Sequence, residues 1–409
     1  MPTRNPPAVD PLRSVEAARA DLLAAVEPLP ALDCRLEEAI GSWLAVPVAA
    51  PVPLPGFDNS AMDGWAVRAE DTRRVPVVLR VAGRSAAGCS PGGRLGPGEA
   101  WRIFTGAPLP EGANAVVRQE ETDWDASHPD AVTLREGVGR WENVRFRGED
   151  VAPGTEVLAA GTRVGAAQAG LLAALGFAAV RVRRRPVVTL VPGGSELRPP
   201  GSPLEPGLVY ESNTPLLAAL CRGAGAVVRA TAAVPDDPDA LAAALRAALE
   251  GSDVVVTAGG ASVGEHDLVR PALEALGGRI EFWRLALKPG KPFFLGRLGG
   301  RVVCGLPGNP VSALVTAVLL VQPLLRRLQG AADPGPYATW GKLGETLTNP
   351  DGRPHWVRVV REAGGEVRPS GPQASHLLGS LSRAHGLVEV PPQGTLAAGD
   401  PVRVVGWEP

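Results

Sequence analysis

The middle of the chain alternates short apolar runs with amphipathic stretches, which is the pattern of a doubly wound α/β domain. Val187–Val191 and Val254–Val256 are apolar runs typical of buried parallel strands. Amphipathic stretches predict helices over Asn213–Leu220, Asp239–Leu249 and about Pro310–Leu328. Further strands are expected near Val227–Val234, Arg279–Leu287, Phe293–Leu298 and Val302–Gly305. Crossover strands in such a sheet are parallel, and ligands bind at their carboxyl ends.

On either side of this domain the pattern changes to short β segments between Gly and Pro turns. Before it, Ser14 can cap a helix that runs to about Val26, and Leu36–Leu44 predicts a short second helix. We therefore expect a multidomain fold: a three-layer α/β domain, a small β domain, a linking segment and a C-terminal β barrel. The expected boundaries are residues 1–46 (N-terminal helices and linker), 47–150 (small β domain), 151–185 (returning linker), 186–330 (α/β domain) and 331–409 (barrel).

One stretch of the α/β domain has the pattern of an anion-binding turn. This stretch is DVVVTAGGASVGEHD (Asp253–Asp267), in which the apolar strand Val254–Val256 is followed by Gly259, Gly260 and Gly264. A helix is predicted over His266–Leu276. A glycine turn that leads into a helix exposes backbone N–H groups, which suits phosphate or another oxyanion. An ordinary βα turn has the same spacing, so this stretch alone leaves both interpretations open.

The loop LKPGKP places Lys288 and Lys291 three residues apart across Pro289 and Gly290. Proline fixes the backbone and glycine lets it turn, so two ammonium groups held at a strand end would attract a polyanion. The alternative is a surface turn with solvated lysines. In the following GLPGN segment, Asn309 and Pro310 are expected at the N-cap and first position of the long helix.

Several carboxylates fall in loops, namely Asp63, Asp150, Glu196, Asp236 and Asp267. Each could simply be a helix cap or a solvated loop residue, as Asp236 could be before the helix that follows it. Beside lysines and a phosphate site, a subset could instead hold Mg²⁺, which binds through few carboxylates plus substrate phosphates. The residues alone therefore indicate a Mg²⁺-assisted site for a phosphorylated anion, without naming the reaction.

Composition excludes several classes of protein. A net charge of −2 gives no general reason to bind nucleic acid or an anionic membrane. The four cysteines are scattered without a CxxC pair, so a disulfide framework is not expected and a reducing, cytoplasmic location fits. The apolar Val311–Val321 stretch is too short to span a bilayer and predicts a core helix.

Seven segments in order resemble the molybdopterin molybdenumtransferase family, which includes the MoeA proteins and the gephyrin E domain. These segments are PGFDNSAMDGWAV (Pro55–Val67), TGAPLPEGA (Thr105–Ala113), NVRFRGED (Asn143–Asp150), YESN (Tyr210–Asn213), GGASVGEHD (Gly259–Asp267), LKPGKP with GLPGNPVSA (Leu287–Ala313) and QASH (Gln373–His376). The resemblance covers nearly the whole chain.

The resemblance implies the last step of molybdenum cofactor synthesis. Adenylylated molybdopterin would be bound, molybdate delivered to its dithiolene, and the pterin phosphate–AMP bond hydrolysed with Mg²⁺. It also implies a homodimer in which the α/β domain of one subunit and the small β domain of the other form the site. Contact with the adenylyltransferase that makes the substrate is a further implied partnership.

The family's site residues carry over position by position. Catalytic positions are Asp63, Asp150, Asp236, Asp267, Lys288 and Lys291, with Asp236 and Asp267 as the implied Mg²⁺ ligands. Substrate-binding positions are Thr105, Glu196, Gly259, Gly260, Ser262, Gly264, Arg284, Pro307, Pro310, Arg358 and Ser375.

Two departures from the family pattern leave alternatives open. Gly193-Gly194-Ser195-Glu196 stands where Thr-Gly-Asp-Glu is usual, and Arg284 stands where lysine is common. The altered loop is the one support for a non-catalytic, scaffold-like paralogue. An adenylyltransferase, which shares the α/β domain, is the other alternative, but the extra β domains argue against it. Molybdate and tungstate are too alike for the sequence to choose between them.

Overall fold

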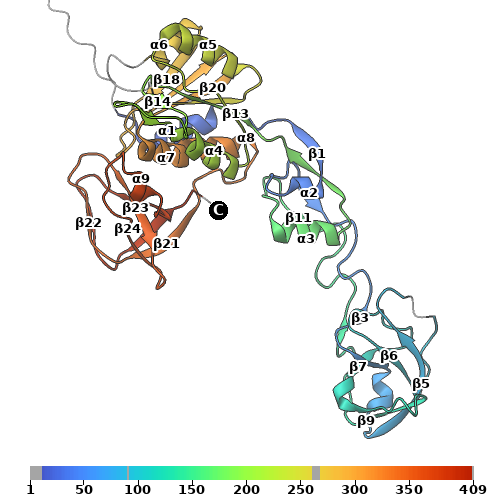
Figure 1. Cartoon of the computed structure of the whole chain (residues 1–409). Coiled ribbons are helices and arrows are strands. Elements are labelled where there is room, and N and C mark those ends of the chain that lie inside the picture. The colour runs from blue at the N-terminus through green and yellow to red at the C-terminus, as the bar shows by residue number, and fades with distance from the viewer. Residues whose placement is uncertain (1–11, 90–91, 260–267, 408–409) are drawn as a thin grey trace, which may run out of the picture.

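The computed structural model describes residues 12–89, 92–259 and 268–407. It shows an extended molecule in which the α/β domain and the C-terminal barrel lie together at one end (Figure 1). A slender middle unit follows, and the small β domain forms the far end (Figure 1). The multidomain α/β and β architecture expected from the pattern is confirmed.

The α/β domain is built on a six-stranded sheet in the order β16-β13-β17-β20-β19-β18. Its strands are β13 (Val187–Pro192), β16 (Val227–Ala230), β17 (Val254–Ala258), β18 (Arg279–Trp283), β19 (Phe294–Leu298) and β20 (Arg301–Leu306). The first four in the sheet are parallel, as predicted. All six were expected to be parallel, and for β19 this was wrong: it pairs antiparallel with both β18 and β20, whereas β18 runs in the same direction as the first four. The Gly299–Gly300 turn, with φ positive at both residues, reverses the chain between β19 and β20 and leaves no room for a crossover helix.

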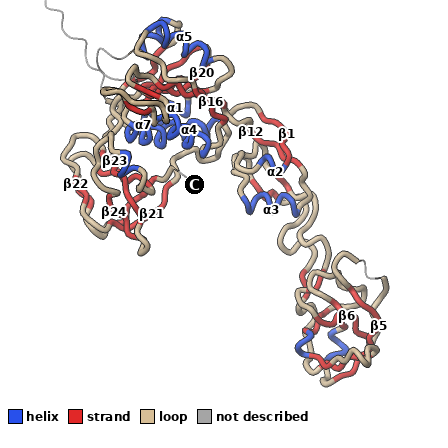
Figure 2. The backbone as a smooth tube through the Cα atoms, in the orientation of Figure 1, coloured by secondary structure: helices blue, strands red, loops and turns tan. Residues whose placement is uncertain are grey.

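Helices cover both faces of this sheet (Figure 2). One face carries α1 (Val15–Ala24), α4 (Asn213–Gly223), α7 (Pro310–Thr316) and α8 (Gln322–Leu328), and the other carries α5 (Pro238–Leu249) and α6 (Val269–Ala275). Alternate residues of each strand serve the two faces: Val254 and Val256 belong to the first core, and Val255 to the second. Ser14 caps α1 by accepting a hydrogen bond from the Ala17 N–H, as predicted.

The long helix predicted near Pro310–Leu328 is present but is not uniform. Between α7 and α8 the five residues η3 (Ala317–Val321) form a π-helical turn. Pro323 lacks the N–H that an α-helical hydrogen bond needs, so the ladder rearranges just before it. This helix is long and apolar enough to cross a membrane, but 94% of its most apolar window is buried inside the protein.

The middle unit is made from two separate parts of the chain. Its elements are β1 (Ala31–Arg35), α2 (Leu36–Ala39), β2 (Val48–Ala49), β11 (Glu156–Leu158), α3 (Ala166–Ala174) and β12 (Ala179–Arg183). The antiparallel pairs β1–β12 and β2–β11 tie the outgoing chain to the returning one. The sequence pattern did not predict β1, because only Ala31 and Cys34 of this strand are partly buried, and a spacing of three residues is not the alternation typical of a strand. The helix expected over Leu36–Leu44 is shorter and ends at Ala39.

The small β domain contains a six-stranded sheet in the order β7-β4-β6-β5-β9-β8. Its elements are β3 (Asn59–Ser60), β4 (Gly64–Val67), η1 (Ala69–Thr72), β5 (Val77–Ser85), β6 (Glu99–Ile103), β7 (Ala115–Arg118), η2 (Gln119–Glu121), β8 (Thr122–Asp123), β9 (Ala131–Leu134) and β10 (Val144–Arg145). The β3–β10 pair brings the PGFDNSAMDGWAV and NVRFRGED segments together at the surface of this domain.

The C-terminal domain is a closed barrel in the order β21-β24-β23-β25-β27. Its elements are β21 (Ala338–Leu343), β22 (Leu347–Thr348), β23 (His355–Arg361), β24 (Glu366–Pro369), α9 (Leu378–Leu381), β25 (Gly386–Val390), β26 (Thr395–Leu396) and β27 (Pro401–Val405). Trp356, Leu387 and Val405 of the barrel belong to the same buried cluster as α4 and α7. The barrel is therefore fixed against the α/β domain by a shared apolar core.

Candidate functional site

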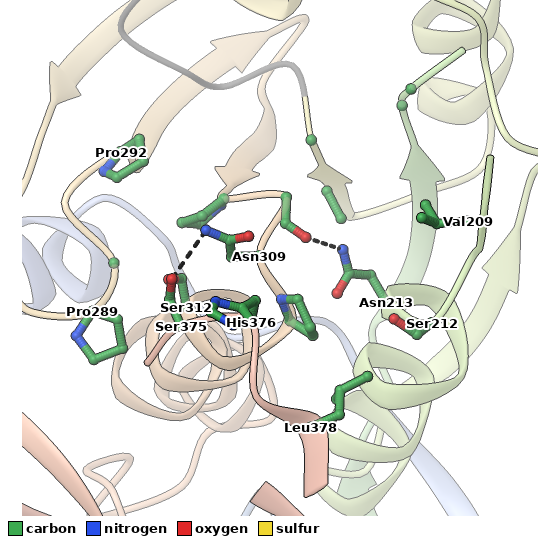
Figure 3. A pocket seen from close by; sticks show the side chains of 18 of the residues that line it. Val209, Ser212, Asn213, Pro289, Pro292, Asn309, Ser312, Ser375, His376 and Leu378 are labelled. Carbon is green, nitrogen blue, oxygen red and sulfur yellow. Dashed lines mark hydrogen bonds between the residues drawn. The ribbon is translucent and has the colours of Figure 1, made fainter. Parts of the chain in front are cut away.

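A cavity of about 1090 Å³ opens between the carboxyl edge of the α/β sheet and the barrel. Figure 3 shows its lining: Pro289 and Pro292 stand on one side, Val209, Ser212 and Asn213 on the other, and Asn309, Ser375 and His376 between them. Of the predicted site residues, those that line it are Glu196, Asp236, Gly259, Lys288, Lys291, Pro307, Pro310 and Ser375. Gly259, the one described residue of the predicted glycine turn, thus lines the same cavity as the two lysines.

Glycines line the cavity where β13 and β17 end: Gly193 and Gly194 follow β13, and Gly259 follows β17. The Gly193 N–H donates to the Ala258 carbonyl at 2.9 Å, and the Gly259 N–H donates to the Leu306 carbonyl at 3.2 Å. Gly259 has φ +93°, and a Cβ there would lie 2.3 Å from the Gly193 oxygen, so only glycine fits. The sheet order reverses between these two strands, which is where ligands bind in open α/β sheets.

The acidic side of the cavity is formed by Glu196, Glu211 and Asp236. Asp236 is not the cap of the following helix, because the neighbouring Asp237 caps α5 by accepting from the Ala240 N–H at 2.7 Å. Instead, Asp236 accepts from the Ser195 N–H at 3.1 Å, and its own N–H donates to the Ser195 Oγ at 2.9 Å. The serine in the altered loop therefore holds the Asp236 carboxylate at the cavity.

The basic side of the cavity is the loop between β18 and β19. Because β19 is antiparallel to both neighbours, β18 ends at the same edge of the sheet as β20, and the loop reaches the cavity. Its Lys288 and Lys291 are two of the three lysines in the chain, which uses arginine almost everywhere else. Within the part of the chain that the structure describes, Lys291 has no carboxylate partner, so its ammonium group can bind an anion.

Lys288 forms an ion pair with Asp351 of the barrel. This ammonium group holds the pKa of the Asp351 carboxyl below its usual range. The Lys288 backbone also bonds across to the barrel, donating to the Pro354 carbonyl at 2.9 Å and accepting from the Trp356 N–H at 2.8 Å. Between these groups, burial and then the Lys288 charge lower the pKa of His355 to about 4, so its ring is neutral at neutral pH.

The barrel contributes a loop that contains the QASH segment. Ser375 Oγ accepts from the Asn309 side-chain amide at 3.1 Å, and the Ser375 carbonyl accepts from the Val311 N–H at 3.2 Å. Asn309 stands at the N-cap of α7, as predicted, but its side chain makes no capping bond and reaches the barrel instead. Pro310 is in the first turn, as predicted.

Arg358 and Arg284 do not line the cavity, although both were expected to bind substrate. Arg358 is 1% exposed, and its guanidinium donates to the carbonyls of Pro372 at 2.6 Å and Ala374 at 3.3 Å. It therefore lies behind the loop and positions Ser375. Arg284, with φ +71°, lies over the Trp283 ring at 3.8 Å.

Asp63, Thr105 and Asp150 are exposed on the small β domain, far from the cavity of the same chain (Figure 1). Asp63 Oδ1 accepts from the Thr105 N–H at 2.7 Å and from its hydroxyl at 2.8 Å. These bonds, the backbone one first, lower the pKa of Asp63, so it is a fixed anion. The remaining predicted positions, Gly260, Ser262, Gly264 and Asp267, lie outside the described residues.

The prediction from sequence did not single out several residues of this site. Arg353, His376 and Asn213 line the cavity, and Asp351 pairs with Lys288. Asp351 and Arg353 flank a glycine just before a barrel strand, a turn signal like that of LKPGKP, but nothing in the sequence indicated that the barrel faces the sheet. Asn213 and His376 fell within the matched YESN and QASH segments without being singled out.

Models of known protein families match this chain over almost its full length. Residues 13–176 match the family model of the MoeA N-terminal region (domain I and II). Residues 189–327 match that of the probable molybdopterin binding domain, and residues 341–407 that of the MoeA C-terminal region (domain IV).

Individual relatives give the same result. Molybdopterin molybdenumtransferase 2 of Mycobacterium tuberculosis is 41% identical, covering 97% of this chain and 100% of that protein. Molybdopterin molybdenumtransferase of Haemophilus influenzae is 37% identical, covering 90% of this chain and 92% of that protein.

The fold of this chain is also similar to that of solved structures. Two crystal structures of the molybdopterin biosynthesis MoeA protein from Pyrococcus horikoshii superpose with TM-scores of 0.79 and 0.83. They are 31% and 27% identical, and cover 98% and 97% of this chain and 100% of each solved chain. The chain belongs to the MoeA family of molybdopterin molybdenumtransferases.

Proposed function

We propose that this chain inserts molybdenum from molybdate into adenylylated molybdopterin and releases AMP with the help of Mg²⁺. Molybdenum insertion into molybdopterin is the reaction of its family. The observation that carries the finer proposal is that glycines at the ends of β13 and β17, an acidic side and the loop with Lys288 and Lys291 share one cavity. A phosphate-linked nucleotide suits the turns, and a tetrahedral dianion suits the lysines.

We propose different roles for the two sides of the cavity. Lys288 and Lys291, with Arg353 and Ser375 from the barrel, would bind and orient the oxyanion. Glu196 and Asp236 would hold the metal and the phosphates on the opposite side. Among the described residues no group of three His, Cys, Asp or Glu is placed to hold a metal. Two carboxylates nevertheless fit Mg²⁺, which takes its remaining ligands from substrate phosphates and water. When bound, the ion would neutralise charge on the cleaved phosphate linkage.

We propose further that the site is completed by a second copy of the chain. Asp63, Thr105 and Asp150 form a polar surface on the small β domain that cannot serve the cavity of its own chain (Figure 1). In a homodimer the small β domain of the partner can cover the cavity, since a two-fold interface gives each subunit the same contact. Contact with the adenylyltransferase would pass the reactive substrate directly to this cavity. The four free cysteines fit a reducing compartment, and we propose the cytoplasm.

An AMP-release assay tests the proposal. Purified protein is incubated with Mg²⁺, adenylylated molybdopterin and either molybdate or tungstate, and AMP and metallated cofactor are measured. AMP should exceed a protein-free control and depend on both Mg²⁺ and oxyanion. No AMP above that control would refute the proposal, and formation of adenylylated pterin from ATP would favour an adenylyltransferase.

Two lysine variants test whether the oxyanion binds at Lys291. Lys291→Ala is expected to lower the rate by about a hundredfold, because it removes a charge aimed at the oxyanion. Lys342→Ala is the control, since Lys342 is the third lysine of the chain and is exposed on strand β21 of the barrel. Equal activity of the two variants would place the oxyanion elsewhere.

A further inference from the structure

The side of the cavity opposite the lysine loop carries a buried acceptor that has no partner. Asn213, the first residue of α4, is 8% exposed and lines the cavity. Its side-chain N–H donates to the Gly308 carbonyl at 2.7 Å, but its Oδ1 makes no hydrogen bond. Figure 3 shows this oxygen turned away from Gly308.

The orientation of the Asn213 amide is fixed by chemistry. A carbonyl can only accept, so the Gly308 oxygen selects the NH₂ group of Asn213 and leaves the oxygen on the other side. A buried acceptor without a donor is costly, and native proteins rarely keep one without a reason. A donor on a ligand in the cavity would satisfy it.

The residues beside Asn213 are suited to a flat ring. Tyr210 lines the same cavity three residues before Asn213, is 45% exposed, and is held by its hydroxyl, which donates to the Ser202 carbonyl at 2.8 Å. Among the described lining residues it is the one phenyl-type ring. Val209, 50% exposed, also lines the cavity. An aromatic face next to a buried amide acceptor matches a planar heterocycle that carries an amino group on its edge.

We propose that Tyr210 and Asn213 form the subsite for the amino-substituted heterocycle of the ligand. Tyr210 stacks on the ring, and Asn213 Oδ1 accepts a hydrogen bond from the ring's amino group. This inference rests on the proposed function for the identity of the ligand, which contains two such rings, a pterin and an adenine. The subsite discriminates an amino group from an oxo group, because an oxo oxygen would face the Asn213 oxygen without a proton between them.

Equilibrium binding to the full-length protein tests this without turnover. Two ligand pairs are compared by calorimetry: AMP against inosine monophosphate, and pterin against lumazine. Each pair exchanges an amino group for an oxo group. In the unaltered protein one pair should show about tenfold preference for the amino ligand, the factor given by one hydrogen bond to a buried acceptor. The pair that discriminates identifies which ring occupies the subsite.

Variants separate recognition from folding. Asn213→Ala should reduce that preference to about one, whereas Tyr210→Leu should weaken both members of the pair together and keep their ratio. Asn309→Ala removes another cavity asparagine, whose amide bonds Ser375 of the barrel, and should leave the ratio unchanged. Thermal unfolding checks that each variant is folded, and Asn213→Ser provides a smaller change if the alanine variant is not.

An unchanged ratio in Asn213→Ala, or no binding of any of the four ligands at millimolar concentration, would overturn the inference. Its failure is distinguishable from that of the proposed function. AMP release with no change in the ratio would refute the subsite alone, and a ratio lost in Asn213→Ala without AMP release would refute the reaction alone.

Discussion

Lys288 and Lys291 show how two identical side chains in one loop acquire different properties. Lys288 is paired with Asp351 of the barrel, whereas Lys291 has no carboxylate partner among the described residues. Both keep a compact ammonium group in a chain that otherwise relies on arginine. A point charge with rotatable donors can follow a tetrahedral oxyanion as it is transferred, which a planar guanidinium does less readily.

If Lys288 binds the oxyanion as proposed, Asp351 competes with that oxyanion for the ammonium group. In Asp351→Asn the competing charge is gone, and the dissociation constant for molybdate is expected to fall about fivefold. Titration calorimetry at low salt measures this, and the effect should shrink as ionic strength rises. Glu366→Gln is the control, since it removes a carboxylate of similar exposure that pairs with Arg368 elsewhere on the barrel. Weaker binding in Asp351→Asn would instead make the ion pair a docking contact between domains.

His355 makes folding stability depend on pH. Its pKa is about 4 in the folded chain against 6.5 ordinarily, so between these values the unfolded chain binds a proton that the folded chain does not. Stability is consequently lost as pH falls from 6.5 towards 4. In His355→Phe this loss is absent, so the variant's unfolding temperature should rise relative to the unaltered protein between pH 7.5 and pH 5. A difference that is the same at both pH values would contradict the assignment.

At the ends of β13 and β17 the cavity is lined by the backbone of glycines rather than by side chains. Gly193 and Gly259 approach so closely that a single methyl group would be excluded at Gly259. This closeness follows from the parallel pairing of β13, β17 and β20, whose ends lie in register. The turn is thus a property of the sheet as much as of its own sequence.

Replacing Gly259 by alanine tests this closeness. Gly259→Ala should lower the free energy of unfolding by about 2–4 kcal/mol, through both its positive φ and the clash with the Gly193 oxygen. Gly277→Ala is the matched control, because Gly277 also has a positive φ but an added Cβ would meet nothing within 4 Å. It should cost about 1 kcal/mol. Denaturant titrations measure both, and equal losses would mean that the turn relaxes.

The sequence predicted the parallel core of the sheet, the long buried helix and the lysine loop, because each depends on local periodicity or on proline and glycine. It did not predict that β19 is antiparallel, because a hairpin and a crossover differ in what lies between strands rather than in the strands. Nor did it predict Asp351 or the position of Arg358 behind the loop. Those depend on the barrel docking against the sheet through a shared core, which is a long-range contact.

At the scale of the whole molecule, the chain carries its two sets of matched residues at opposite ends (Figure 1). Lys291 and Asp236 line the cavity, and Asp63 and Asp150 lie on the small β domain. If two copies complete each other's sites, damage at one end of a subunit leaves its other end usable.

Mixing two inactive variants tests this arrangement. Asp63→Asn and Lys291→Ala are unfolded and refolded together in equal amounts, and AMP release is measured. Half of the random dimers would be mixed, each with one intact site, so about a quarter of full activity should return. Each variant refolded alone is the control. No recovery in the mixture would mean that each site uses residues of one subunit.

The small β domain leaves and rejoins the rest of the chain at a single point. The Leu54 N–H donates to the Val151 carbonyl at 2.9 Å, and the Ala50 N–H donates to the Thr155 carbonyl at 2.9 Å, so the outgoing and returning strands are already joined there. The small β domain is therefore a single insertion between these two strands. Removing or exchanging it would leave the path of the rest of the chain unchanged. A different distal domain could therefore be joined at this point without altering the α/β domain, the barrel or the cavity between them.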